Sequence, residues 1–293
     1  MDELALTESF KLLFNVIQFC PEGRSDLNKS LAPTLKILTR LTILSRPIQS
    51  PLSNLINALL NLDLEAETSP PSLLFPDPNS THFVDRLIHI LDLAVHGYKE
   101  AELEKCAVPL VTLIQRIYGL APDKVKSFMQ SQLLPSDTER MKPLGQSDTL
   151  PAFLLRITIS PVAPSLRESI SNMLFELSDR DAGRLVRNVG YGFAAGYLMS
   201  HSISLPEGAL EEWKTADLEA SKVHEDGHSI NPITGQRRDM EGGEPEDDRT
   251  EEEKLREAER LFVLFERLRA TGVVDVQNPV AQAIQEGRFE ELE

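Results

Sequence analysis

The 293-residue chain is poor in the residues that mark disulfide-bonded, membrane-spanning or sheet-rich proteins. Only 6% of its residues are aromatic, and only two are cysteine, Cys20 and Cys106. Both cysteines lie in stretches with the apolar spacing of a helix, so we expect buried free thiols in a reducing, cytoplasmic compartment. No run of eighteen apolar residues and no basic start before an apolar core is present, so we expect neither stable membrane insertion nor a signal peptide.

Motifs of covalent catalysis and of metal binding are also missing. The sequence contains no GxSxG, phosphate-binding loop or kinase signature, and neither cysteine has an activating motif. His82, His89 and His96 recur every seven residues, about 10 Å apart on a helix, which is too far to share an ion. His224 and His228 have a suitable spacing but lie in a segment with little to hold their geometry. We therefore expect no metal, no cofactor and no catalytic residue, hence a binding protein that is not an enzyme.

Acidic residues gather in one segment. The net charge of the chain is −16, from 30 Lys and Arg against 46 Asp and Glu. Residues 1–202 hold 22 acidic and 19 basic side chains, whereas residues 203–253 hold 16 acidic and only 5 basic ones. An acidic segment rich in Gly and Pro buries too little apolar surface to offset the entropy of ordering. We therefore predict an acidic, largely disordered linker over 203–249, and no nucleic-acid partner.

Leucine is abundant, and its spacing predicts a helical-repeat protein. Apolar residues at helical intervals predict helices over 3–20, 25–45, 52–62, 82–98, 101–120, 122–134, 150–159 and 164–177. Stretches 63–81 and 135–149, rich in Pro and small polar residues, are predicted as loops. Each helix is too small to bury its apolar face alone. We therefore predict an all-α armadillo/HEAT-like solenoid over 1–202, with an irregular helical bundle as the alternative.

Residues 179–202 are the least ordinary stretch. Arg180, Arg184 and Arg187 recur at helical spacing and predict one basic stripe on a helix. Three glycines between residues 190 and 196 follow, and they predict either a sharp corner between helices or a backbone that another segment approaches closely. Similar glycine spacing occurs in dinucleotide-binding turns, but those follow a strand, and the segment before this one is predicted to be a helix.

Residues 250–293 are predicted to form a C-terminal helix and a tail. A capping box, Thr250-x-x-Glu253, opens the helix, and Gly272 ends it. Its apolar face is too large to leave in water and consists of Leu255, Leu261, Phe262, Leu264, Phe265 and Leu268. We expect this helix to dock, either as a cap on the solenoid or on a bound partner whose complex it strengthens.

Five short motifs, together with an upstream helix, resemble the C-terminal portion of one family, the synembryns. They are LLFNVIQ (12–18), PLGQSDTL (143–150), MLFELSDRD (173–181), RNVGYGFAAGYL (187–198), SINPITGQ (229–236) and EEEKLREAERLFVLFERL (251–268). Synembryns are cytosolic exchange factors and chaperones of heterotrimeric G-protein α subunits. The resemblance covers essentially the whole chain, whereas the family has a further block of helical repeats before it. We therefore expect a fragment or a truncated start, and reduced exchange activity on its own.

The resemblance implies a superhelix whose groove grips the C-terminal helix of a Gα subunit. Gα would arrive GDP-bound, lose GDP as its helix is pulled, and persist nucleotide-free, while the same grip would shelter a newly made Gα. Differential affinity for two conformations is sufficient for this, without covalent chemistry. The resemblance also implies a cytoplasmic protein recruited to the cell cortex, with phosphorylation of the acidic stretch at Thr215 or Ser221. The alternatives are a helical-repeat scaffold that binds a peptide without nucleotide exchange, and a hydrolase, which the missing nucleophile motif disfavours.

Four residues are predicted to bind the partner. By the resemblance, Arg184 and Arg187 match basic positions before the family's glycine corner, Asn188 follows them, and Asn15 lies in the LLFNVIQ helix. A Gα tail ends in a carboxylate, which suits the forked donors of arginine. Asparagine can hold a peptide backbone because its amide both donates and accepts. The alternative is a solvated basic face for the arginines and ordinary capping or core bonding for the asparagines.

Overall fold

Helices account for the regular structure of the residues that the computed structural model describes: 2–20, 22, 24–65, 72–204, 230–231 and 233–240. They are α1 (Glu3–Phe19), α2 (Arg24–Leu27), α3 (Leu31–Arg40), α4 (Leu52–Asn61), α5 (His82–Gly97), α6 (Glu100–Cys106), α7 (Val108–Leu120), α8 (Asp123–Leu133), α9 (Leu150–Thr158), α10 (Pro164–Leu177), α11 (Ala182–Val189) and α12 (Tyr191–Ser200). Within the described residues the only bridge between extended segments joins Ile230 to Arg237. The predicted all-α, helical-repeat fold is confirmed; the C-terminal helix and residues 205–229 of the linker lie outside the described residues.

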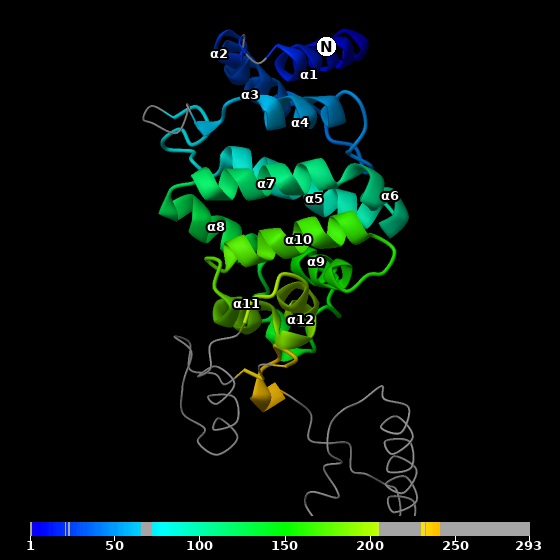
Figure 1. Cartoon of the computed structure of the whole chain (residues 1–293), viewed down its shortest axis with the longest axis vertical. Helices are drawn as coiled ribbons and strands as arrows, with labels where there is room; N and C mark the ends of the chain where they lie inside the picture. The colour runs from blue at the N-terminus through cyan, green and yellow to red at the C-terminus, as the bar shows by residue number, and fades with distance from the viewer. Residues whose placement is uncertain are drawn as a thin grey trace, which may run out of the picture. The chain divides into compact units, whose positions relative to one another are not determined.

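Five of the helices form a row in which each contacts the next. α1 packs on α4, α4 on α7, α7 on α10 and α10 on α12. In Figure 1 this row runs from α1 at the top of the view to α12 at the bottom. α3, α5 and α9 form a second layer, in which α5 contacts both of the others. Contacts between neighbouring units in chain order are the arrangement of a helical-repeat protein.

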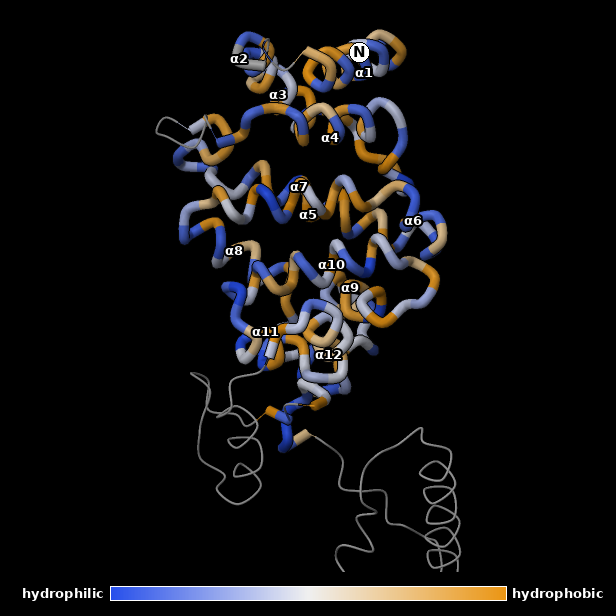
Figure 2. Tube along the Cα trace, viewed as in Figure 1, coloured by the Kyte–Doolittle hydropathy of each residue, from blue (hydrophilic) through white to orange (hydrophobic). Residues whose placement is uncertain are grey.

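One continuous apolar core runs through the stack, from Phe10 in α1 to Leu198 in α12. In Figure 2 apolar (orange) and polar (blue) segments alternate along the helices. In the sequence, apolar residues recur at intervals of three or four, so one side of a helix can face the shared core. In α5, for example, Phe83, Leu87 and Leu91 are all buried. Each such side chain contributes about 1.5–3 kcal/mol when it leaves water, so the stack is stabilised along its whole length.

Arginines from one repeat close helix ends in another. Arg86 of α5 donates to the carbonyl of Leu41, just past the end of α3. Arg116 of α7 donates to the carbonyl of Leu60, in the last turn of α4, over 2.8 Å. The last carbonyls of a helix have no partner within it, and a cation also suits the negative end of the helix dipole. These bonds therefore hold successive repeats in register.

A carboxylate does the same at the start of α10. The two oxygens of Glu104 in α6 accept from the backbone N–H groups of Ser165 (3.0 Å) and Leu166 (2.9 Å). Burial acts to raise the pKa of Glu104, but the hydrogen bonds from Leu166 and Ser165 and the charge of Arg167 outweigh it, so the pKa lies below its ordinary value. The ionised side chain is thus a helix cap supplied by another repeat.

Two predicted helices are divided in the structure. The helix expected over 25–45 becomes α2, a 3-10 turn at Asn28–Ser30, and α3, which ends at Arg40. The helix expected over 101–120 breaks at Ala107 into α6 and α7. Pro109 is the second residue of α7, where its missing N–H has no intrahelical partner to lose, so it starts a helix rather than kinking one. None of the described helices is long and apolar enough to cross a membrane.

Candidate functional site

The glycine-rich stretch forms a corner between two short helices. Asp181 caps the start of α11, its carboxylate accepting from the N–H of Arg184 over 2.7 Å. Gly190 ends α11 and begins α12 with φ 81° and ψ 148°, a conformation that is essentially restricted to glycine. The predicted sharp corner is therefore present.

The same corner is also approached closely by a distant segment. Gly192 donates its N–H to the carbonyl of Ile233 over 3.0 Å. A methyl group placed on Gly190 would lie 2.9 Å from the backbone nitrogen of Gly235 and 3.0 Å from the carbonyl carbon of Thr234. The structure therefore contains both features that the glycine spacing predicted as alternatives: a sharp corner between helices and a backbone that another segment approaches closely. The SINPITGQ motif was predicted as part of the linker, and its described residues fold against the α11–α12 corner.

Arg140 joins the corner and the distant segment by hydrogen bonds. Its guanidinium donates to the carbonyl of Gly235 (2.9 Å) and to that of Asn188 (2.8 Å), while its own carbonyl accepts from the N–H of Arg237 (2.8 Å). The side chain is only 6% exposed, and burial lowers the pKa of Arg140 from its ordinary value. A buried guanidinium bonded to two carbonyls ties the end of α11 to the glycine turn. We call these residues, Arg140, Asn188, Gly190 and Gly235, the clasp.

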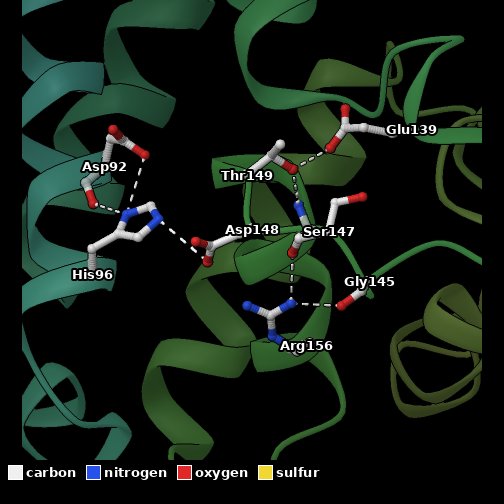
Figure 3. Close-up of polar contacts among 9 residues, drawn as sticks. Asp92, His96, Glu139, Gly145, Ser147, Asp148, Thr149 and Arg156 are labelled. Atoms are coloured by element: carbon white, nitrogen blue, oxygen red, sulfur yellow. Dashed lines mark hydrogen bonds and ion pairs between the residues drawn. The ribbon is translucent and has the colours of Figure 1, made fainter.

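The loop before α9 packs against the clasp. Arg156 donates to the carbonyls of Gly145 (2.6 Å) and Ser147 (3.0 Å), and Thr149 caps α9; Figure 3 shows these bonds. Leu144 of the same loop touches Gly235, where a methyl group would come within 2.4 Å of its Cδ1 atom. Four of the motifs that carry the family resemblance therefore meet here, although they are spread over residues 143–236.

The predicted basic stripe is shorter than expected. Arg180 lies before α11 in a left-handed conformation (φ 56°), not on the helix, and pairs with Glu176 at 2.7 Å. Arg184 is on α11 and pairs with Asp179. Arg187 is exposed and makes no ion pair with any described residue. Of the three arginines, Arg187 is thus the one whose charge no carboxylate of the described chain compensates.

The two predicted asparagines have different surroundings. Asn188 is half-buried, and its side chain donates to the hydroxyl of Ser178 over 3.0 Å, so it fits the core-bonding alternative. Asn15 is exposed on α1, at the opposite end of the stack from α11 (Figure 1). The structure therefore brings together Arg184, Arg187 and Asn188, and leaves Asn15 apart. Their roles in binding remain predictions.

Three further residues, Asn57, Gln115 and Arg140, were not predicted as candidates from the sequence. Asn57 on α4 and Gln115 on α7 are half-buried, and within the described chain their side chains make no hydrogen bond. They lie on neighbouring helices of the row, which the bond from Arg116 to Leu60 ties together. No sequence pattern marked these amides, since single Asn and Gln residues are common on helices. Arg140 was also missed, because its partners are 48 and 95 residues away.

Some predicted sites lie outside the described residues. They are the phosphorylation sites Thr215 and Ser221 and the apolar helix within 250–293. In the part of the chain that is described, no three His, Cys, Asp or Glu side chains are grouped closely enough to hold a metal ion.

Comparison with known proteins gives one family over nearly the whole chain. Residues 1–288 match the sequence model of a family described as guanine nucleotide exchange factor synembryn. The chain belongs to the synembryn family. It is 25% identical, over 98% of its length, to a synembryn-like chaperone of Schizosaccharomyces pombe. It is 32% identical over 60% of its length to the chaperone Ric-8 of Drosophila pseudoobscura, and 28% identical over 74% to the chaperone Ric-8A of Rattus norvegicus.

The chain spans about half the length of these relatives or less. The matches cover 56%, 31% and 40% of the yeast, fly and rat proteins, respectively. The synembryn description also corrects one expectation, that the protein is not an enzyme: exchange of guanine nucleotides is a catalytic activity on G proteins. The expectation was wrong because it equated catalysis with a nucleophile or a metal. Binding one conformation of a partner more tightly than another can accelerate a reaction without either.

Proposed function

We propose that this chain acts on G-protein α subunits as a guanine nucleotide exchange factor and folding chaperone. It would grip the C-terminal helix of a GDP-bound Gα, release GDP and stabilise the nucleotide-free state. Membership of the synembryn family carries this proposal, together with the names of the relatives as chaperones. The same grip serves both roles, since it favours a Gα conformation with an open nucleotide site.

Amide side chains on the row of helices support the proposed binding of the Gα helix. Asn57 and Gln115 present amides on successive helices of the row, and an amide can donate to and accept from the backbone of a bound segment. Both amides are free to do so because neither is engaged within the described chain. We assign them, with Asn15 on α1, to the surface that receives the Gα helix.

Arg187 supports the recognition of the end of that helix. It is exposed and makes no ion pair within the described part of the chain, whereas Arg184 already pairs with Asp179. A terminal carboxylate is a partner that a guanidinium binds with two parallel hydrogen bonds. The clasp fixes the end of α11 one residue after Arg187, at Asn188. Arg187 is therefore held on a rigid element, which lowers the entropy lost on binding.

A scaffold that binds Gα without exchange is the second candidate. It requires only the binding surface on the row of helices and Arg187, without any effect on the bound nucleotide. One experiment separates the two: release of fluorescent GDP from purified Gα, and binding of Gα to the chain, measured on the same samples. Binding with faster release supports exchange, binding with unchanged release supports the scaffold, and no binding rejects both.

The proposed partner also gives a location. We propose that the chain is cytoplasmic and that binding to Gα recruits it to the cell cortex. A fluorescent fusion should leave the cortex when Arg187 is replaced by Glu. If the fusion with Arg187→Glu stayed at the cortex, the chain would be held there by something other than this contact with Gα.

A further inference from the structure

Two glycines of the described chain have surroundings that do not require glycine. Glycine is less favourable than alanine within a helix, so it usually marks a left-handed backbone or a close contact. Six of the eight glycines in the described chain meet one of these conditions: Gly97, Gly145, Gly183, Gly190, Gly192 and Gly235. Gly119 and Gly196 meet neither. Their φ is not positive, and apart from their chain neighbours and the adjacent helix backbone no atom lies within 4 Å of an added methyl group.

Gly119 lies in the middle of the row of helices, whereas Gly196 lies on its last described helix. α7, which carries Gly119, packs on α4 on one side and on α10 on the other (Figure 1), so its exposed side is not an end of the array. Glycine is also common as a left-handed cap at the end of a helix. Here the helix continues through Leu120, and the cap residue is Ala121 with φ −74°. Capping therefore does not explain Gly119 either.

The exposed side of α7 belongs to the surface that we assign to the Gα helix. Thr112, Gln115 and Gly119 are spaced by three and four residues, so they fall on one side of α7. None of them is charged. Arg116 beside them donates to the carbonyl of Leu60 on α4 over 2.8 Å. This side of α7 thus offers a hydroxyl, the free amide of Gln115 and, one turn further, an unfilled space.

The space at Gly119 lies toward the part of the stack that carries Arg187. Tyr118, the residue before it, accepts through its hydroxyl from the side chain of Gln130 over 3.0 Å. The same side chain donates to the carbonyl of Leu177, the last residue of α10, over 2.9 Å. The end of α7 is therefore close to the end of α10, from which the chain turns into α11. A helix whose terminal carboxylate is held at Arg187 can run across Gly119.

We propose that Gly119 is a specificity-determining residue of the surface that receives the Gα helix. Its missing side chain leaves the space that a large, uncharged side chain of the bound helix fills. The distance between packed helices depends on the side chains where they cross, so a glycine permits the closest approach. Glycine at this position weakens α7 but improves the fit to the partner. This inference rests on the proposed function, because it names a residue of the same surface.

The experiment compares Gly119→Ala and Gly119→Leu with the unaltered full chain by calorimetric titration with a peptide that spans the C-terminal helix of Gα. Affinity should fall with alanine and should fall by about tenfold or more with leucine, because a fitted contact tolerates added volume poorly. Urea unfolding should change in the opposite direction. Both variants should have a higher midpoint than the unaltered chain, since alanine and leucine form helices better than glycine. A residue with a structural role alone would not combine higher stability with weaker binding.

Ser127→Ala and Ser127→Leu are the matched controls. Ser127 is exposed on α8, outside the row, and its side chain makes no hydrogen bond within the described chain. Alanine and leucine also form helices better than serine, so these variants should be at least as stable as the unaltered chain. Their affinity for the peptide should not change.

Three results would overturn the inference while the unaltered chain binds the peptide. The first is unchanged affinity in both variants of Gly119. The second is an equal loss of affinity in the variants of Ser127, which would show that added surface bulk, and not the space at Gly119, controls binding. The third is a lower urea midpoint in the variants of Gly119, which would assign the glycine a structural role. If the unaltered chain binds no peptide, the proposed function fails, and the inference fails with it.

Discussion

Gly190 and Gly235 lie back to back, with room for no side chain between them: a methyl group on Gly190 would sit 2.9 Å from the nitrogen of Gly235. The two residues are 45 positions apart, and the segment between them includes the first part of the predicted linker. Their contact joins residues 233–236 to the corner between α11 and α12. The corner that presents Arg187 therefore depends on a turn from within the predicted linker.

The close contact predicts a large effect of a single methyl group. Gly190→Ala forces a strained backbone conformation and a clash with the backbone of the glycine turn, and should destabilise the protein by about 1–3 kcal/mol. Gly196→Ala is the control: Gly196 lies within α12 with open space around it, so alanine should stabilise by about 0.5–1 kcal/mol. Urea unfolding of both variants measures the difference. Equal effects would show that the contact is loose.

The clasp predicts that removing the side chain of Arg140 destabilises the protein more than removing an exposed ion pair does. Arg140→Met removes the donors to two carbonyls, each of which costs about 1–3 kcal/mol when buried without a partner. Hydrogen exchange should then rise at the N–H of Gly235 and of Arg237. Arg180→Met, at an exposed ion pair, should change stability by less than about 1 kcal/mol. Unaltered exchange in Arg140→Met would contradict the clasp.

Arg187 should dominate recognition of the Gα tail among the arginines. Arg187→Glu should weaken binding of a peptide from the Gα C-terminus by about tenfold or more, since a charge-assisted bond contributes about 1.5–3 kcal/mol. Arg184→Glu should add to this loss, and helical circular dichroism should barely move in either variant. Calorimetric titration with the peptide measures the affinities, with Arg180→Glu as the control. Unchanged affinity in Arg187→Glu would remove this residue from the binding surface.

The lowered pKa of Glu104 predicts a pH dependence of stability. A carboxylate with a lowered pKa in the folded state contributes stability that is fully present above its unfolded pKa, about 4.3, and is lost as pH falls through the folded pKa. Glu104→Gln should therefore destabilise at neutral pH and flatten the acid side of the profile. Free energies of unfolding across this range give the test. Lys105→Gln, on an exposed neighbour, should keep the original profile.

Helix positions were largely predictable from the sequence, because they depend on local spacing. α10 begins and ends where expected, at Pro164 and Leu177, since proline favours the first turn and the apolar repeat is regular. Divisions of longer helices were not foreseen. The break at Ala107 depends on where Pro109 finds a helix start, and the end of α3 depends on a bond from Arg86 in another repeat.

The site was predictable only in part, because its decisive contacts are long-range. Glycine spacing indicated a corner or a close approach, but nothing local identified Gly235 as the partner of Gly190. Arginine spacing indicated a basic stripe, but the ion pairs that neutralise Arg180 and Arg184 depend on the turn before α11. The composition of the linker predicted disorder throughout, whereas the turn at Gly235 is held in place because it packs against the α11–α12 corner.

The central claim is that this chain accelerates nucleotide exchange on Gα, and single-turnover release of fluorescent GDP tests it most directly. Purified Gα loaded with the labelled nucleotide is mixed with the chain, with Arg187→Glu, or with buffer, in the presence of excess unlabelled GTP. The account predicts faster release with the unaltered chain, rising with its concentration, and a smaller acceleration with Arg187→Glu. Release at the rate seen in buffer, from a sample in which the chain demonstrably binds Gα, would contradict it.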